Sequence, residues 1–344
     1  MRLGLYLLGD GLRLPEIGQL AADAEAAGFE SVWAGEYWHS GFAAAAAVAR
    51  ATSRVRVGTG VVQAFPRTPM TTALEALDTD DLAGGRFILG LGPQVRRYNE
   101  RLHGIEYGKP VRRMREYVQA LRSLWGLAAG QSPVLPRGEY YGFDFTGFTR
   151  PVPAVRASVP VYLSAVRPAM TRLAGECADG LIGHPMSSAT DIAAYAGWLA
   201  EGAARSGREP AEVEHVQFVM CSVAADEEQA RREAAQQIAL YAATQTYAYR
   251  LEQLGFAAER AAIRAAYQAR DLAAMAQAAS GPVTDAFAVA GTAAQVRERL
   301  AARARGSYTL VLAPPTYGLA ADRVTELTRD LIAVFGETPA EEGG

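Results

Sequence analysis

Short apolar runs alternate with amphipathic helical patterns along most of the chain. The runs lie at residues 3–8, 31–35, 54–62, 86–92, 159–165, 179–184, 213–225 and 307–315. Each is short and bounded by turn-forming residues, as buried strands are. Helical spacing of apolar residues fills the gaps, at residues 15–27, 42–51, 70–82, 112–127, 168–178, 189–206, from 226 onward, 291–304 and 321–335. Eight strands alternating with helices predict an α/β fold, a (β/α)8 TIM barrel.

The alternative is an open, doubly wound sheet that binds a dinucleotide. No clean GxGxxG follows the first predicted strand, and the GLGPQV at 90–95 has Val95 where the third glycine belongs. This segment also follows the fourth strand rather than the first, so a dinucleotide fingerprint is weakly supported.

Two stretches interrupt the alternation. Residues 128–158 are rich in Gly, Pro and aromatic residues, which indicates an excursion with a short hairpin. Residues 240–285 are helical and rich in Ala and Gln without a strand, which indicates a helical insertion after the seventh strand. We therefore expect one barrel domain with two insertions over residues 1–335, and a disordered acidic tail at 336–344.

Bulk composition excludes several classes of protein. The 344 residues carry a net charge of −3 with scattered Arg residues, so nothing favours a nucleic-acid surface. No apolar stretch approaches the roughly 20 residues of a membrane helix, and the N-terminus lacks a signal-peptide pattern. Two cysteines, Cys177 and Cys221, allow no disulfide framework, which fits a reducing cytoplasm. They lie within a helix and a strand, where core packing is expected. Four widely separated His residues make a metal site improbable.

The segment after the second strand, WAGEYWHSG, is the first candidate for chemistry. In a parallel barrel, ligands bind at the carboxyl ends of the strands. Glu36 and His39 would place a carboxylate and an imidazole there, with Tyr37 and Trp38 as aromatic walls. Such a group suits proton transfer beside a flat conjugated ligand. The alternative is a surface loop in which Ser40 caps the next helix.

Glycines and amides follow the third and fourth strands. Gly58 and Gly60 allow close approach of the backbone to a ligand, and Gln63 and Arg67 supply polar groups at the mouth. The turn after the fourth strand supplies Gly92, Gln94 and Asn99. Ordinary turns remain the alternative at both places.

The loop after the fifth strand offers an anion site. Backbone N–H groups at the helix N-terminus, next to the cation of Arg167, suit a phosphate. The residues concerned are Val166, Arg167, Ala169 and Met170. His184 ends the sixth strand, where it either points into the mouth or has a structural role; His103 and His215 have the pattern of surface or packing residues.

Four blocks then point to a family. GTGVVQAFPRTPM, GGRFILGLGPQV, RMREYVQALRSLW and RLAGECADGLIGHP occur in this order over residues 1–335. Together they resemble the bacterial luciferase-like family of flavin and deazaflavin oxidoreductases, with the nearest likeness to actinobacterial members that use coenzyme F420. The resemblance implies a luciferase-like (β/α)8 barrel with insertions, often a homodimer, with the deazaflavin ring in the mouth.

The resemblance also implies roles for residues. Glu36 and His39 would flank the ring, with His39 as a candidate proton donor. Other matching positions would hold the cofactor: the bulged segment Val61, Val62 and Gln63, where many members have a non-prolyl cis peptide; Gly92 to Gln94, in the turn that approaches the cofactor; and Ala165 to Met170, at the phosphate. Asn99 and His184, at the mouth, are also expected to contact the cofactor.

This chain departs from the family at two points. Tyr37 and Trp38 replace smaller residues or His, which reshapes the substrate side, and Val166-Arg167 replaces Gly-Pro or Gly-x, which adds a charge at the phosphate loop. The two insertions are expected to cover the mouth, with Tyr241 among the aromatic residues that contact an organic or peptide substrate.

The leading hypothesis is a cytoplasmic F420-dependent reductase that transfers hydride to a C=C, C=N or C=O bond of an organic substrate such as a natural product. A deazaflavin reacts poorly with oxygen, which favours hydride transfer over oxygenation. The alternatives are a reduced-FMN-dependent monooxygenase of the same family and a non-catalytic flavin-binding barrel.

Overall fold

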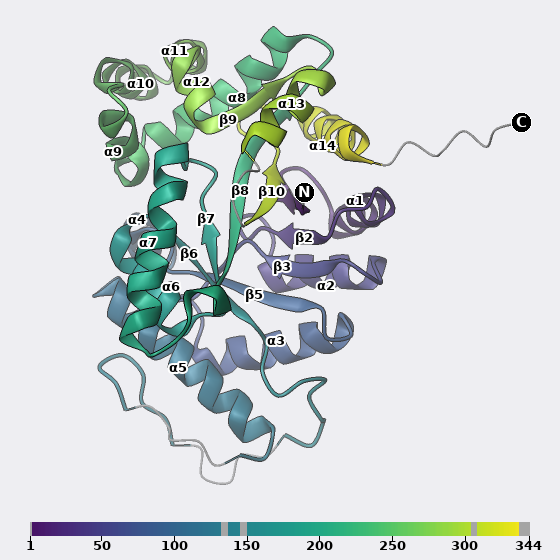
Figure 1. The fold of residues 1–344 in the computed structure, drawn as a ribbon, viewed down its shortest axis with the longest axis vertical. Helices are drawn as coiled ribbons and strands as arrows, with labels where there is room; N and C mark the ends of the chain where they lie inside the picture. Colours follow the sequence, from purple (N-terminus) through teal and green to yellow (C-terminus); the bar gives the residue numbers. More distant parts are fainter. Residues whose placement is uncertain (1, 132–136, 145–149, 304–307, 337–344) are drawn as a thin grey trace, which may run out of the picture.

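A closed ring of parallel strands forms the centre of the computed structural model, which describes residues 2–131, 137–144, 150–303 and 308–336 (Figure 1). Pairing of the last strand with both the first strand and β8 closes the ring. Around it the order is β10 (Thr309–Ala313), β1 (Leu3–Leu7), β2 (Ser31–Ala34), β3 (Arg56–Thr59), β5 (Phe87–Gly92), β6 (Val161–Ala165), β7 (Gly180–Gly183) and β8 (Glu214–Val223). The predicted TIM barrel is confirmed.

Helices follow the strands and cover the outside of the ring. They are α1 (Leu14–Ala26), α2 (Gly41–Ala51), α3 (Pro69–Leu82), α5 (Pro110–Ala128), α6 (Pro168–Cys177), α7 (Ala189–Arg205), α8 (Glu227–Ala242), α13 (Ala293–Arg303) and α14 (Ala321–Phe335). Local sequence sets their ends. Thr68 caps α3 by accepting the Thr71 N–H, and Gly28, at φ +87°, lets the chain turn after α1.

The inside of the ring is filled by side chains. Its apolar cluster consists of Trp33, Ile88, Tyr162, Ile182, Val216, Phe218 and Val311. Trp33 fits because Gly58 faces it: a Cβ at Gly58 would lie 2.2 Å from the indole Cε3. At the amino end of the ring, Glu214 accepts hydrogen bonds from Arg56 and from the Tyr162 hydroxyl. Burial alone would raise the pKa of Glu214, but these two partners lower it to about 2.

The third predicted strand is broken in the structure. The apolar run at 54–62 forms β3 and then, after a cis Gly60–Val61 peptide, β4 (Val62–Gln63), which pairs with β5. Two further elements were not predicted: α4 (Arg96–Leu102) and β9 (Ala288–Gly291). β9 pairs with the last residues of β8, beyond the barrel. It was not predicted because four small residues directly after a helix show no alternation of apolar and polar positions.

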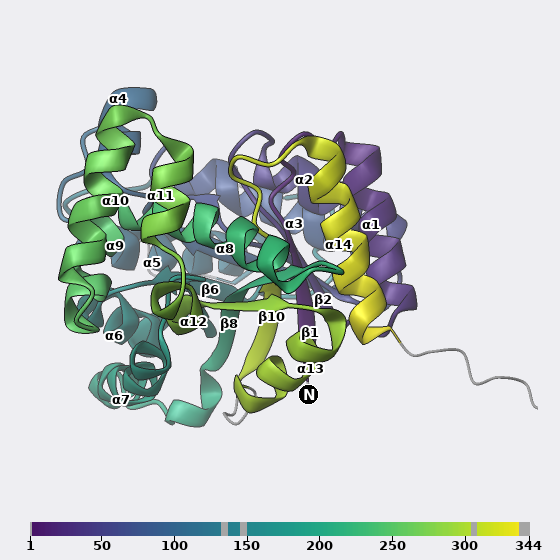
Figure 2. The same cartoon turned by 90° about the horizontal axis from the view of Figure 1, so that it is seen from above.

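The predicted helical insertion consists of α9 (Gln245–Gln253), α10 (Ala257–Ala269), α11 (Leu272–Ala278) and α12 (Pro282–Phe287). These helices stack beside the barrel and pack on α8 (Figure 2). Their own apolar cluster includes Met186, Ile238, Leu251, Ile263, Met275 and Phe287. In the excursion at 128–158, Arg137 and Gly142 form an antiparallel bridge. Most of the predicted tail lies outside the described residues. Among the described helices, none is long and apolar enough to cross a membrane.

Candidate functional site

The carboxylate of Glu36 is enclosed by hydrogen bonds. Arg67 binds it with both Nη atoms, at 2.9 and 2.6 Å, and the backbone N–H groups of Gln63 and Gly41 donate to it at 2.7 and 3.0 Å. The side chain is 8% exposed. Gly41 begins α2, and Gln63 and Arg67 lie on β4 and in the loop after it, so the carboxylate ties the second and third βα connections together. This arrangement favours a positioning role for Glu36 rather than proton transfer.

His39 points toward the loop after β1. Its Nε2 lies 2.7 Å from the Leu12 carbonyl oxygen, which can only accept, so Nε2 carries a proton. Gly9 packs against the ring, where a Cβ would lie 3.0 Å from Cδ2. Nδ1 is therefore the ring atom at which His39 can exchange a proton.

The bulge between β3 and β4 lies over the barrel's aromatic floor. A Cβ on Gly60 would lie 2.9 Å from Phe218 and 3.1 Å from Tyr6, so only glycine allows this approach. The neighbouring strand makes similar room, since a Cβ on Gly92 would lie 2.8 Å from Val61. Val62 is buried. The bulge therefore packs closely on the protein's own side chains, and the approach of Val61–Gln63 and Gly92 to a cofactor stays a prediction.

The turn after β5 is supported by two amides. Gln94 adopts φ +56° and accepts the Val95 N–H with its own Oε1. Asn99 is fully buried and donates to the carbonyls of Pro93 and Val95, while its Oδ1 has no hydrogen-bond partner among the described residues. Both side chains were predicted to contact a cofactor. Their placement instead favours support of the turn from behind.

The loop after β6 leads into α6 without a side-chain cap. Tyr249 and Arg250 both donate to the Val166 carbonyl, at 2.7 and 3.2 Å. Because carbonyl and N–H point in opposite directions across a trans peptide, the Arg167 N–H points away from these donors. The Arg167 guanidinium lies over the Tyr249 ring, 4.3 Å from its centroid. With Pro168 as the first helical residue, the N–H groups of Ala169 and Met170 complete an open helix N-terminus of the kind that binds phosphate.

His184, at the end of β7, is held in an aromatic corner. The Met186 N–H donates to its Nδ1 at 3.0 Å, so Nδ1 is unprotonated. Tyr247 stacks on the ring at 4.2 Å between centroids, and Tyr241 meets it edge-on at 5.0 Å. Burial, assisted by the charge of Arg250, holds the pKa of His184 well below its usual value. His184 is therefore a neutral imidazole.

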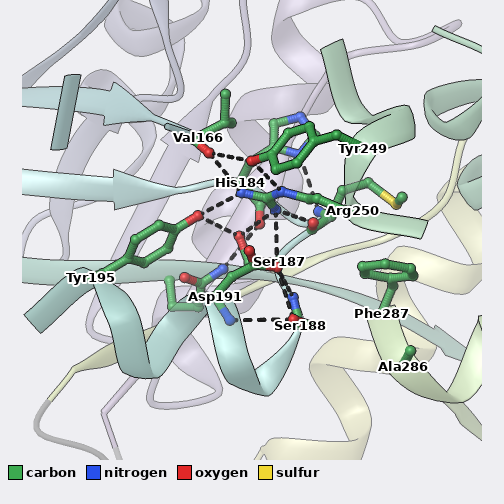
Figure 3. A network of polar contacts seen from close by, with 12 residues as sticks. Val166, His184, Ser187, Ser188, Asp191, Tyr195, Tyr249, Arg250, Ala286 and Phe287 are labelled. Atoms are coloured by element: carbon green, nitrogen blue, oxygen red, sulfur yellow. Dashed lines mark hydrogen bonds and ion pairs between the residues drawn. The ribbon is translucent and has the colours of Figure 1, made fainter. Parts of the chain in front are cut away.

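Arg250 was missed from the sequence and is the centre of a polar network under the mouth (Figure 3). Its side chain is fully buried. It donates to the Met186 and Val166 carbonyls and to the hydroxyls of Ser187, Tyr195 and Tyr249. The nearest carboxylate, of Asp191, is 3.8 Å away. Helix α9 is thereby fixed to the loops after β6 and β7. An Arg within the otherwise Ala- and Tyr-rich 240–250 stretch was the one available signal.

The rim of the mouth carries exposed aromatic residues. The Tyr37 and Tyr98 hydroxyls are hydrogen-bonded to each other, and Trp38 meets Tyr37 edge-on with 68% of its side chain exposed. Tyr37 and Trp38 thus stand where a substrate would enter. A cavity of about 340 Å³ lies elsewhere, beside α5, and is lined by Arg112, Arg115, Glu116, Gln119, Arg137 and Gly138. None of the predicted site residues lines it, so we place the site at the mouth by its chemistry.

Comparison with known proteins decides the family. The luciferase-like monooxygenase family model matches residues 1–309. The chain belongs to this family. Among its luciferase-like relatives, an uncharacterized protein of Mycobacterium tuberculosis is 35% identical over 86% of this chain and 90% of its own length. A putative coenzyme F420-dependent oxidoreductase of the same organism is 37% identical over 65% of this chain and 66% of its own length.

A solved structure agrees on the fold. The coenzyme F420-dependent tetrahydromethanopterin reductase of Methanopyrus kandleri superposes with a TM-score of 0.79 at 23% identity, covering 95% of this chain and 97% of the reductase. The resemblance seen in the four sequence blocks is confirmed at the level of the family. The roles of individual residues stay predictions.

Proposed function

We propose that this protein is an F420-dependent oxidoreductase that transfers hydride between the deazaflavin and an unsaturated bond of an organic substrate. The observation that carries the proposal is the open N-terminus of α6 beside the barrel mouth. There the Val166 carbonyl accepts hydrogen bonds from Tyr249 and Arg250, α6 begins without a side-chain cap, and the Arg167 guanidinium lies over the Tyr249 ring. A long cofactor with a phosphate and a flat ring fits this combination.

The chain's own residues fit such a cofactor. Gly60 and Gly92 let the bulge pack closely on Phe218, Tyr6 and Val61, and His39 and His184 follow the carboxyl ends of β2 and β7. The bound deazaflavin would supply or accept the hydride at C5. Val61 to Gln63 and the turn at Gly92 would support the ring, and residues 165–170 would hold the phosphate.

His39 would move the proton that accompanies the reaction. Since its Nε2–H is given to the Leu12 carbonyl, the exchange takes place at Nδ1. Glu36 would keep the geometry by holding Gln63, Gly41 and Arg67 in place. His39 would therefore contact the reacting atoms, whereas Glu36 would position the backbone around them.

Fluorescence titration of the purified protein with F420 and with FMN tests the proposal. We expect F420 to bind at micromolar concentration or below and FMN to be ignored. Arg167→Ala should weaken F420 binding about three- to tenfold and reduce its salt dependence, because one charge-assisted contact to an anion is lost. Arg270→Ala, at an exposed position after α10, is the matched control. Binding of FMN alone would replace this proposal with the family's reduced-FMN-dependent monooxygenase reaction.

A further inference from the structure

Two histidines follow strands on opposite sides of the ring. From β2 to β7 the ring runs through β3, β5 and β6 in one direction and through β1, β10 and β8 in the other, four steps either way. His39 follows β2 and His184 follows β7, so they stand on opposite walls. The two imidazoles differ in the ring nitrogen that the protein binds. In His39 the protonated Nε2 donates to the Leu12 carbonyl, and in His184 Nδ1 accepts from the Met186 N–H.

The wall at His184 forms an aromatic recess. Tyr6, His184, Tyr241 and Tyr247 each keep part of their surface accessible. Burial nevertheless raises the pKa of Tyr6 and Tyr247, and raises that of Tyr241 to about 12. We call this group of partly accessible side chains the aromatic recess. Its floor continues through Tyr6 to Phe218, 5.0 Å away between ring centroids, beneath the Gly60 bulge.

The hydrogen-bonding capacity of the recess is fixed by the backbone. A Met186 N–H that donates to Nδ1 leaves the proton of a neutral imidazole on Nε2. No described residue accepts a hydrogen bond from that Nε2–H. Tyr247 covers one face of the ring and Tyr241 meets it edge-on, so only the ring edge is left to meet a ligand.

Charge around the recess selects against anions. The Asp10 carboxylate acts on both Tyr6 and Tyr241, and its Oδ1 is buried without a hydrogen-bond partner among the described residues. The cation nearest to His184, Arg250, directs its donors at the protein's own carbonyls and hydroxyls. An uncharged ligand would not be repelled by Asp10 and would not need Arg250 as a counter-ion.

We propose that His184 is a neutral hydrogen-bond donor, through Nε2, to the carbonyl or imine group of a flat, uncharged substrate held in the recess of Tyr6, Tyr241 and Tyr247. This rests on the proposed function and names the substrate class of the same site. A neutral donor stabilises the negative charge that grows on the oxygen or nitrogen during hydride arrival at carbon, without itself giving up a proton. The proton that completes the reduction then comes from a separate acid, the role proposed above for His39 Nδ1.

Side-chain NMR of the ¹⁵N-labelled protein tests the donor directly and needs no cofactor. His184→Gln assigns the signal among the four histidines. We expect the Nε2–H tautomer and no titration between pH 5.5 and 8, with Arg250, Tyr241 and Tyr247 as the polar groups that face the ring. An Nδ1–H tautomer, or a titration near pH 6.5, would overturn the proposal.

Binding of three small probes tests the substrate class. They are 4-methoxybenzaldehyde, 4-methylanisole, which lacks the carbonyl, and 4-methoxybenzoate, which is an anion. We expect the aldehyde to bind about five- to tenfold more tightly than the other two, the contribution of one hydrogen bond. His184→Phe should abolish that preference and His184→Gln should keep part of it, because glutamine retains an N–H donor. Thermal unfolding confirms that both variants are folded.

The outcomes separate this inference from the proposed function. Equal binding of aldehyde and methylanisole, or an unchanged preference in His184→Phe, would overturn the subsite. Preserved aldehyde selectivity together with absent F420 binding would support the subsite and remove only the proposed cofactor.

Discussion

Replacement of Arg250 by methionine should detach the insertion from the barrel mouth. Methionine has a similar length and no donor, so it removes the hydrogen bonds without opening a large cavity. In the part of the chain that the structure describes, Arg250 is the single donor from α9 that reaches the loops after both β6 and β7, through Val166 and Met186. The variant therefore tests whether that polar network, rather than apolar contact alone, holds α9 in place.

The loss in free energy of unfolding depends on which groups lose a hydrogen-bond partner when Arg250 is replaced. The Met186 carbonyl is left without the Arg250 donor, and a buried acceptor left unpaired costs about 1–3 kcal/mol. The Val166 carbonyl keeps the Tyr249 hydroxyl, and the Ser187 and Tyr195 hydroxyls keep each other at 2.9 Å. Loss of their bonds to a charged donor adds to the cost. We expect a total of about 3 kcal/mol, at the lower end of the range for breaking a buried charged network.

Two measurements read this out. Urea unfolding gives the loss of global stability, and hydrogen exchange locates it: protection should fall in residues 245–253 and in the loops at 166–168 and 184–188. Arg250→Lys should lose less, because an ammonium keeps the charge while reaching fewer acceptors. A loss below about 1 kcal/mol, with unchanged exchange in α9, would refute the reasoning.

Three further predictions concern parts of the fold away from the mouth. Because the pKa of Glu214 is depressed to about 2 in the folded protein, its contribution is present above the unfolded pKa of about 4.3 and is lost as the pH falls toward 2. Urea unfolding at pH 5 and pH 3 should show a smaller difference in Glu214→Gln than in the wild type. Gly58→Ala should lower stability by about 3 kcal/mol or more in thermal unfolding, because the new methyl group meets a buried indole. Gly197→Ala, in open space within α7, should instead raise stability by up to about 1 kcal/mol, and a similar loss in both variants would contradict the steric argument. Burial raises the pKa of the Cys177 and Cys221 thiols to about 12, so both should resist a thiol reagent at pH 8 until the protein unfolds. Fast labelling of the native protein would refute that expectation.

Elements with a strong hydrophobic period were the ones predicted best. The eight barrel strands and their helices are present because buried strands need continuous apolar runs and covering helices need one apolar face. The apolar run at 54–62 misled for the same reason: its composition is that of a strand throughout, but the chain bends at Gly60 above Phe218. Apolar composition predicts that a segment is buried, but it does not predict where the strand leaves the sheet.

Side-chain roles were harder to predict than positions. The sequence placed Glu36, His39 and His184 at the carboxyl ends of strands, which the structure bears out. It predicted the same chemical role for Glu36 and His39, whereas the carboxylate is engaged by Arg67 and backbone N–H groups. The hydrogen-bond partners of a charged group come from loops in different parts of the chain. A local sequence pattern therefore cannot predict their number.

The sequence by itself determined the barrel, its insertions and the family. These follow from local periodicity, turn residues and short blocks of neighbouring residues, which act within a few turns of chain. Only the tertiary structure decided that His39 and His184 follow strands on opposite sides of the ring, since that depends on ring closure through β8 and β10. It also decided that Arg250 reaches Val166, 84 residues earlier, because docking of α9 on the barrel is a contact between distant segments. Such contacts are set by packing of the whole chain rather than by any stretch of it.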